Sequence, residues 1–253
     1  MVRGVVTGLN AAFVIDGATR EALLARDPRA AAIVHPWARG RDVRAWRLLP
    51  SGLWLLFTQR GIDLARYPGV REHLERFRAR LTPRDAGGGE GRKPGRYRWH
   101  EIQDRVAYAG AFAEPKIVFS KFVTAPRFAW DESGAFTSNA TGILPGAPAW
   151  LVALLQSDLL WRVLRRRLTR LQNGYWQIMN AVLLALPILE PDAADRAVLA
   201  GAVERLASGA AAPEEARSLA ARCEAIVRRT YGVGDRRPGR GDGAGVDRMT
   251  GPF

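Results

Sequence analysis

Cysteine, lysine and histidine are scarce in this chain of 253 residues. Cys223 is the only cysteine, so neither an intrachain disulfide nor a cysteine-based zinc site can form, which fits a reducing interior. The three histidines, His35, His73 and His100, lie far apart and lack the spacing of metal ligands. Structural roles are therefore favoured for them, and no metal site is predicted.

Long hydrophobic runs are also missing. The longest apolar stretch covers residues 181–189, which is too short to span a bilayer. The chain does not open with the charged and apolar regions of a secretory signal peptide. We therefore expect a soluble protein of the cytoplasm.

Charge of one sign dominates what is present. Lys and Arg number 38 against 25 Asp and Glu, a formal net charge of +13, and lysine occurs only at Lys93, Lys116 and Lys121. The planar guanidinium of arginine suits phosphates and guanine edges, so an anionic polymer is one explanation of the excess. A general preference for arginine in an Ala- and Gly-rich chain explains the composition equally well.

Residues 1–146 predict an α+β region of short strands in mixed or antiparallel sheets. Compact apolar runs predict strands at 13–15, 53–57, 116–118, 122–123, 128–130 and 135–136, with a hairpin turn at 131–134. Helices are predicted at 19–26 and at 67–81, where Pro68 suits the first turn. The glycine-rich segment 85–96 predicts a flexible loop that carries Arg92, Lys93 and Arg96 and could order against phosphates.

The final third changes character. Residues 147–231 predict a helical region with one long helix over 148–171. Two further helices, at 192–208 and 213–231, predict an antiparallel C-terminal hairpin because each carries an apolar stripe. Residues 232–253 are rich in Gly, Arg and Asp, and we expect a disordered tail there.

Several short motifs recur in a characteristic order along the chain. They are Gly4-x-x-Thr7-Gly8-x-Asn10 running into Phe13-Val14-Ile15-Asp16, then His35-Pro36-Trp37, Trp54-Leu55-Leu56, Tyr67-Pro68, Phe112-x-x-Pro115-Lys116-Ile117-Val118, Leu155-Gln156-Ser157, Leu186-Pro187-Ile188 and Ile226-Val227-x-x-x-Tyr231-Gly232-Val233. In this order they resemble the TaqI-like C-terminal specificity domain. That domain is the target-recognition part of adenine-N6 DNA methyltransferases and fused restriction–modification enzymes. For Gly8 and Asn10 themselves we expect a structural tight turn.

The resemblance implies a domain that grips double-stranded DNA for a neighbouring methyltransferase. Neither the Gly-rich cofactor loop nor the Asn/Asp-Pro-Pro-Tyr/Phe motif of that enzyme occurs in the sequence. No catalytic residue and no cofactor are therefore expected here, and S-adenosylmethionine would bind to the partner. The expectation is a separated specificity subunit or the C-terminal part of a split or truncated gene, with a nuclease partner also conceivable.

Arginines near the end of the predicted helix 148–171 are the predicted contacts to the DNA backbone. They are Arg162, Arg165, Arg166, Arg167 and Arg170, together with Lys121. Arg162, Arg166 and Arg170 recur every four residues and so would share one helix face. Cations near a helix C-terminus are favoured by the dipole, but five exceed what capping requires.

Five other residues are predicted to read bases, because they combine base-edge chemistry with positions on turns or strand starts. They are Arg39, Arg41, Lys116, Asn173 and Gln177. For the turn at 39–44, an internal Arg–Asp pair that braces the fold is an equally good interpretation.

Two other functions compete with DNA recognition. The helical hairpin 192–231 could be a docking surface for the methyltransferase, with the charge incidental. Glu114-Pro115-Lys116 formally matches half of a nuclease metal site, with Asp104 as an upstream carboxylate. That pattern is short and common, and the family motif explains Lys116 without a metal, so nuclease activity is the least favoured function.

Overall fold

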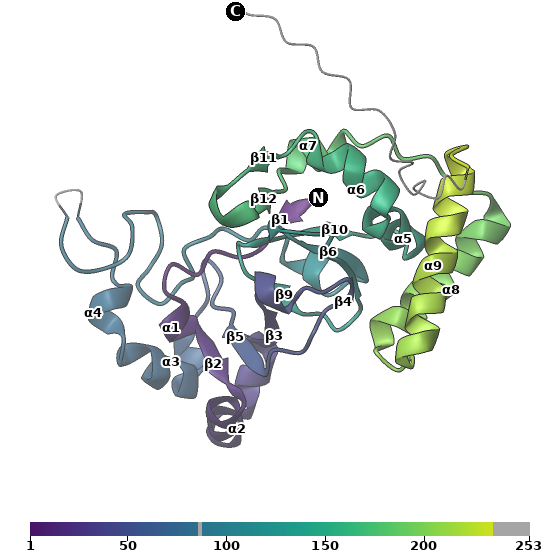
Figure 1. Ribbon diagram of the computed structural model, residues 1–253. Coiled ribbons are helices and arrows are strands. Elements are labelled where there is room, and N and C mark those ends of the chain that lie inside the picture. Colours follow the sequence, from purple (N-terminus) through teal and green to yellow (C-terminus); the bar gives the residue numbers. More distant parts are fainter. Residues whose placement is uncertain (86–87, 235–253) are drawn as a thin grey trace, which may run out of the picture.

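Short strands and helices build an α+β fold, as the sequence predicts, and the computed structural model describes residues 1–85 and 88–234 (Figure 1). Its strands form sheets of five, four and three strands. The strands are β1 (Val2–Arg3), β2 (Val14–Asp16), β3 (Val34–Ala38), β4 (Trp46–Arg47), β5 (Leu53–Leu56), β6 (Lys116–Ser120), β7 (Phe122–Val123), β8 (Phe128–Asp131), β9 (Phe136–Thr137), β10 (Thr141–Pro145), β11 (Thr169–Arg170) and β12 (Trp176–Gln177).

The helices lie around these sheets. The α-helices are α1 (Asn10–Phe13), α2 (Gly17–Arg26), α3 (Pro68–Glu75), α4 (Arg78–Leu81), α5 (Trp150–Gln156), α6 (Asp158–Arg165), α7 (Asn180–Leu184), α8 (Ala193–Ser208) and α9 (Pro213–Thr230). Short 3-10 turns are η1 (Pro28–Ile33), η2 (Gly40–Asp42), η3 (Leu64–Arg66), η4 (Ala109–Phe112) and η5 (Gln172–Gly174). None of the helices in residues 1–85 and 88–234 is long and apolar enough to cross a membrane.

The five-stranded sheet, in the order β1-β10-β6-β8-β4, joins the two halves of the chain. Successive side chains of a strand point to opposite faces. In β6, Val118 therefore packs into the core of the N-terminal half, whereas Ile117 and Phe119 pack into the core of the helical half. Because both faces are covered, all five residues of β6 are buried. The predicted boundary at 146/147 falls between β10 and α5.

The turn after β8 differs from its prediction. Residues 131–134 were expected to close a hairpin, but β8 belongs to the five-stranded sheet and β9 to the four-stranded one, in the order β2-β5-β3-β9. β9 pairs in parallel with β3 rather than with β8. The segment therefore carries the chain from one sheet to the other.

The C-terminal hairpin is confirmed, and its ends have the expected caps. The Asp192 carboxylate accepts a hydrogen bond from the Asp195 amide at 2.8 Å, and Gly209 ends α8 with φ at 70°. Pro213 occupies the first turn of α9. Figure 1 shows α8 and α9 side by side at one edge of the molecule.

Two predicted helices are interrupted. The helix expected over 148–171 ends at Gln156, because Ser157 is extended and its hydroxyl accepts a hydrogen bond from the Leu160 amide at 3.1 Å as the cap of α6. α6 itself ends at Arg165, and the chain then enters β11. The helix expected over 67–81 divides into α3 and α4 at Phe77, whose φ and ψ are −110° and 10°.

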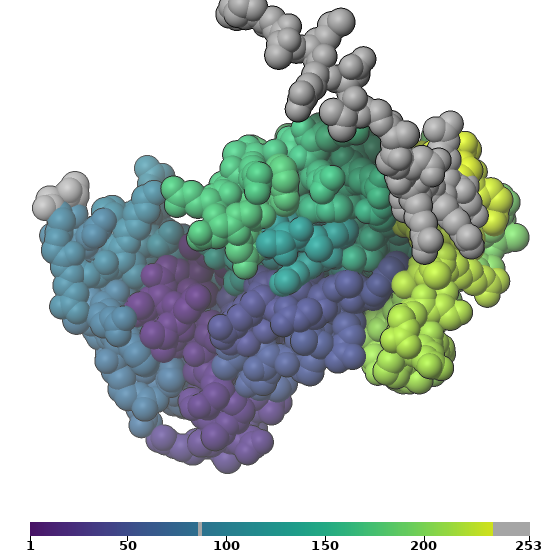
Figure 2. Space-filling view, viewed as in Figure 1, coloured from purple at the N-terminus to yellow at the C-terminus, as the bar shows by residue number. Residues whose placement is uncertain are grey.

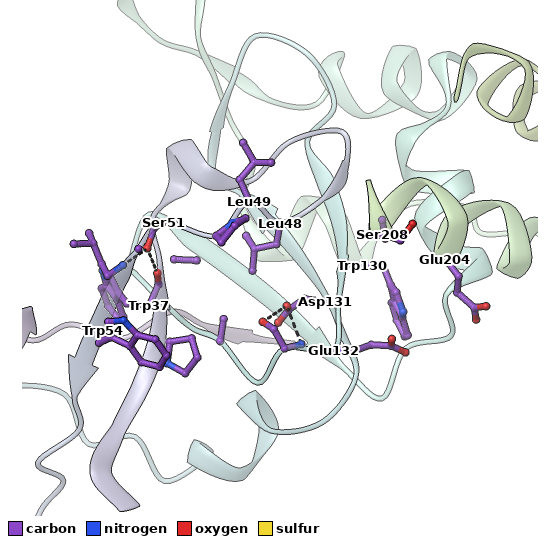
Figure 3. Close-up of a pocket in the computed structure, with 18 residues that line it drawn as sticks. Trp37, Leu48, Leu49, Ser51, Trp54, Trp130, Asp131, Glu132, Glu204 and Ser208 are labelled. Atoms are coloured by element: carbon purple, nitrogen blue, oxygen red, sulfur yellow. Dashed lines mark hydrogen bonds between the residues drawn. The ribbon is translucent and has the colours of Figure 1, made fainter. Parts of the chain in front are cut away.

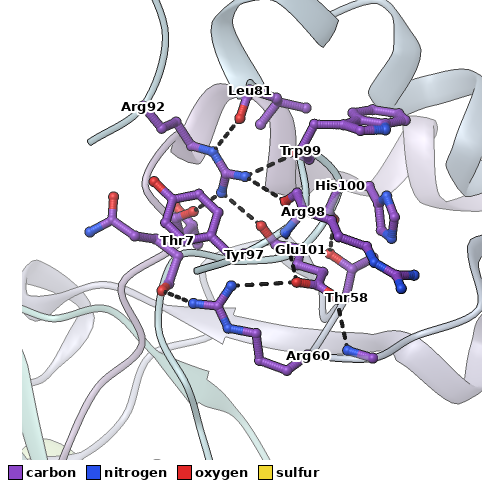
Figure 4. A network of polar contacts seen from close by, with 12 residues as sticks. Thr7, Thr58, Arg60, Leu81, Arg92, Tyr97, Arg98, Trp99, His100 and Glu101 are labelled. Atoms are coloured by element: carbon purple, nitrogen blue, oxygen red, sulfur yellow. Dashed lines mark hydrogen bonds and ion pairs between the residues drawn. The ribbon is translucent and has the colours of Figure 1, made fainter. Parts of the chain in front are cut away.

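The segment predicted as a flexible loop, 85–96, of which residues 85 and 88–96 are described, is anchored to the fold at Arg92. Arg92 is 3% exposed, and its guanidinium donates hydrogen bonds to the carbonyls of Thr7, Leu81, Arg98, Trp99 and Glu101 (Figure 4). A loop anchored in this way is not free to order against phosphates through Arg92. Of the predicted tail, residues 235–253 lie outside the described part.

Candidate nucleic-acid interface

A small three-stranded sheet, in the order β11-β12-β7, carries several of the predicted DNA-binding residues. β11 and β12 form an antiparallel ribbon, and the Leu171 amide donates to the Tyr175 carbonyl at 2.7 Å to close its tip. Asn173 and Gly174 both adopt left-handed backbone conformations there, with φ of 64° and 78°. Asn-Gly is a typical pair for such a tip, because both residues tolerate positive φ at little cost.

The register of this sheet decides which side chains face solvent. Trp176 lies opposite Val123, which is fully buried, so these two side chains face the core. Gln177 lies opposite Phe122, and the alternation of strands places this neighbouring row on the outer face. Phe122 is accordingly 42% exposed. Gln177, which is half-buried, thus lies next to the exposed Phe122 ring on the outer face.

The ribbon corrects the predicted arginine face. Arg166, Arg167 and Arg170 do not continue the helix, so Arg162, Arg166 and Arg170 do not share one helical face. Arg162 pairs with Asp158 at 2.7 Å, and Arg167 donates to the Ala185 carbonyl at 3.1 Å. The guanidinium of Arg170 lies 5.9 Å from the centre of the Trp176 ring.

Arginines without ion pairs lie close together in sequence, from the end of α6 to β11. Within residues 1–85 and 88–234, Arg165, Arg166, Arg167 and Arg170 make no ion pair, and all four are exposed. The arginines of the C-terminal hairpin differ. Arg205 pairs with Glu215 at 2.7 Å and Arg229 with Asp195 at 2.7 Å, among others. The hairpin therefore neutralises much of its own charge, whereas the arginines of the ribbon and of the turn before it do not.

The turn at 39–44 combines the two interpretations left open by its sequence. Arg39 makes the internal pair: its guanidinium donates to both Asp42 carboxylate oxygens at 2.8 and 3.0 Å. Burial acts to raise the pKa of Asp42, but the hydrogen bonds from the side chain and backbone of Arg39 outweigh it and hold that pKa below its ordinary value. Arg41 and Arg44 are exposed and make no ion pair within the described residues.

The turn at 39–44 is linked to the ribbon through the segments around Lys121 and Ala140. A Cβ placed on Gly40 would lie 3.2 Å from that of Ala140 and 3.4 Å from the Ser120 hydroxyl, so the turn rests on the β6 and β9–β10 ends. Lys121 donates to the Asn139 carbonyl at 3.1 Å, and the Ile178 amide donates to the Lys121 carbonyl at 2.8 Å. Figure 2 shows the indigo N-terminal segment, a teal patch and the green ribbon region adjacent on one face.

Lys121, which is half-buried, lies between the turn 138–141 and the ribbon. Burial, with the nearby positive charge of Arg3, lowers the pKa of its ammonium group. Arg3 itself pairs with Asp104 at 2.7 Å. A phosphate placed beside Lys121 would offset both unfavourable effects, because it restores a counter-charge to a partly desolvated ammonium.

Lys116 does not belong to this surface, and its predicted role in base readout is wrong for this structure. Its side chain is fully buried, and its ammonium pairs with Asp131 across β6 and β8 at 2.5 Å and donates to the Phe112 carbonyl at 2.7 Å. Lys116 does not form the nuclease-like site that its sequence pattern suggests. Glu114 is exposed, and Asp104 pairs with Arg3 instead. Residues 1–85 and 88–234 contain no cluster of three or more His, Cys, Asp or Glu that could hold a metal ion.

The structural turn expected at Gly8 is present. Gly8 has φ of 83°, and a Cβ there would lie 2.8 Å from the Gln103 amide oxygen. Asn10 instead begins α1, and its amide oxygen accepts a hydrogen bond from the Thr7 hydroxyl at 2.6 Å. Phe122 is the surface residue that the sequence analysis missed. The sequence offered one indication of its exposure. Successive residues of a strand face opposite sides, so only one of Phe122 and Val123 can point into the core.

No model of a known protein family matches the sequence, and no curated protein does either. Among solved structures, the fold is similar to part of the type IIL restriction–modification enzyme MmeI, determined in complex with DNA. The match has a TM-score of 0.66 at 15% sequence identity and covers 93% of this chain. It covers 33% of the MmeI chain, so this chain spans about a third of that enzyme. The chain thus shares its fold with part of a restriction–modification enzyme, while the resemblance to the TaqI-like domain stays a prediction.

Proposed function

We propose that the chain recognises a sequence in double-stranded DNA and directs a separate adenine-N6 methyltransferase or restriction–modification enzyme to it. The observation that carries the proposal is the ribbon β11–β12 with the turn before it, where unpaired arginines lie beside the exposed Asn173, the half-buried Gln177 and the exposed Tyr175 ring. A two-stranded ribbon is narrow enough to enter the major groove. The likeness to part of MmeI, a structure solved with DNA, supports the same function.

The proposed division of labour follows from exposure and chemistry. Arg165, Arg166, Arg167 and Arg170, with Lys121 and Arg162, would meet phosphates. Arg41, Asn173 and Gln177 would reach base edges, where Arg suits guanine and the amides suit adenine. Arg39 would hold the turn through Asp42. In this proposal S-adenosylmethionine binds to the partner methyltransferase, and a nuclease could join the same complex.

A salt titration tests DNA binding itself. If the ribbon meets duplex phosphates, the logarithm of the binding constant falls linearly with the logarithm of salt concentration, with a slope of about −0.9 for each phosphate neutralised. Fluorescence anisotropy with a labelled random duplex measures it. If the chain serves only as a protein-docking module, duplex DNA will not bind at any moderate salt concentration, and the proposal fails.

Base readout is tested by single substitutions. Gln177→Ala or Arg41→Ala should cost about 1–3 kcal/mol of discrimination at one base pair while random duplexes bind almost as before. Competition binding against a library varied across the site, with the partner methyltransferase present, resolves the affected position. Thr169→Ala, on the same row of the sheet as Gln177, is the matched control. An unchanged preference in both Gln177→Ala and Arg41→Ala would place readout elsewhere, with the turn 138–141 next to be tested.

A further inference from the structure

A groove of about 520 Å³ lies between the strands β3 and β5 on one side and the C-terminal end of α8 on the other. Its walls come from β3, the segment that leads into β5, the turn after β8, and the last turn of α8, as Figure 3 shows. Most of the lining is apolar. The apolar residues include Trp37, Leu48, Leu53, Trp54, Trp130 and Ala207.

The charge of the groove is opposite to that of the chain. None of the Lys and Arg residues in the described part of the chain lines the groove. Its charged lining residues are Asp131, Glu132 and Glu204. Asp131 is neutralised by Lys116, but Glu132 and Glu204 are exposed and make no ion pair within the described residues.

Two cations lie near the groove, and neither makes an ion pair with Glu132 or Glu204 within the described residues. The guanidinium of Arg20 stacks on the Trp54 ring, 3.8 Å from its centre. The guanidinium of Arg47 lies against the backbone of Gly209 at the C-terminal end of α8, where it faces the negative end of the helix dipole. It is not among the residues that line the groove. The two free carboxylates are therefore left for an occupant from outside.

We propose that this groove docks an extended segment of a partner protein in which an arginine or lysine neighbours a large apolar side chain. Figure 3 shows Trp37 and Trp54 at one end of the groove, and Glu132 and Glu204 beside Trp130 at the other. The apolar side chain fits the first end. The cation fits the second, where two carboxylates and an indole ring are available to it.

The same charges argue against nucleic acid as the occupant. Phosphates would be repelled by two free carboxylates in an apolar setting, whereas the ribbon offers them unpaired arginines. The groove and the proposed DNA surface are thus separate sites of opposite charge. The last turn of α8 forms one wall of the groove, so the C-terminal hairpin takes part in the proposed docking.

The test uses the full chain and a capped hexapeptide of alternating leucine and arginine. Binding is followed by calorimetry and by the fluorescence of the groove tryptophans, against peptides of alternating leucine with glutamate and serine with arginine. The Glu132→Gln/Glu204→Gln variant should bind the leucine–arginine peptide about fivefold to tenfold more weakly, since partly exposed charges contribute modestly. Ala207→Arg, which puts a cation into the groove, should reduce binding further.

The matched control is Glu21→Gln/Glu214→Gln, which removes the same charge at exposed positions away from the groove and should leave binding unchanged. All variants should keep the affinity of the parent for duplex DNA, so failure here leaves the proposed function untouched. The proposal is overturned if the leucine–arginine peptide does not bind at millimolar concentration. It is also overturned if the leucine–glutamate peptide or the serine–arginine peptide binds equally well. Competition by duplex DNA for the groove, or an unaffected Glu132→Gln/Glu204→Gln variant, would overturn it too.

Discussion

Arg92→Ala should lower the free energy of unfolding by at least ~3 kcal/mol, because it leaves several buried carbonyls without their donor. The Arg92 guanidinium bonds to five carbonyls at 2.7–3.2 Å, with no carboxylate among its hydrogen-bond partners. Burial lowers the pKa of Arg92 to about 10, so the group stays charged near neutral pH. Chemical denaturation followed by circular dichroism measures the change.

Lys93→Ala is the control, since it removes the same charge from an exposed neighbour. It should change the free energy of unfolding by less than about 0.5 kcal/mol. Arg92→Lys should recover only part of the loss, because an ammonium cannot reach five carbonyls in the plane of a guanidinium. Equal stability of the Arg92→Ala and Lys93→Ala variants would contradict the role assigned to this side chain.

Replacing Arg165, Arg166 and Arg170 together with alanine should weaken binding to specific and random duplexes alike. If each meets one phosphate, the salt slope should flatten by about 2.7, three times the contribution of a single contact. Arg167 is left in place because its guanidinium also bonds to the Ala185 carbonyl, so that its loss would disturb the local structure. Anisotropy titrations at four or more salt concentrations measure the slope.

The control replaces Arg66, Arg80 and Arg84, which are exposed, make no ion pair within the described residues and lie outside the proposed interface. Because this variant loses the same net charge, a smaller effect on the slope identifies the ribbon as the site of contact rather than charge alone. If only specific binding suffers in the ribbon variant, these arginines read bases and their assignment to the backbone is wrong.

Local patterns predicted the helices that carry clear end signals. Asp192 and Pro213 mark the starts of α8 and α9 within one residue, and Pro68 marks the start of α3. Apolar runs likewise located β2, β5, β6 and β8. These features could be predicted because the residues that cap or break each element lie within the element or directly beside it in sequence.

The errors arose where partners are distant in sequence or where one residue redirects the backbone. Leucines recur at helical spacing on both sides of Ser157, so nothing in the apolar pattern showed that this serine would cap a new helix. Lys116 has the chemistry of a base reader, but the register of β6 and β8 places Asp131 opposite it. Arg92 lies in a glycine-rich segment, and the carbonyls that hold it come from residues 7, 81, 98, 99 and 101.

The central sheet, with one core on each face, has a consequence for how the chain loses its structure. Ile117 and Phe119 point into the helical half while Val118 between them points into the N-terminal half, so neither half can open without exposing β6. Units that share a strand in this way melt together as one cooperative transition rather than as independent foldons. A shortened chain ending at β10 would leave Ile117 and Phe119 without the helices that cover them, and we expect it not to fold stably on its own.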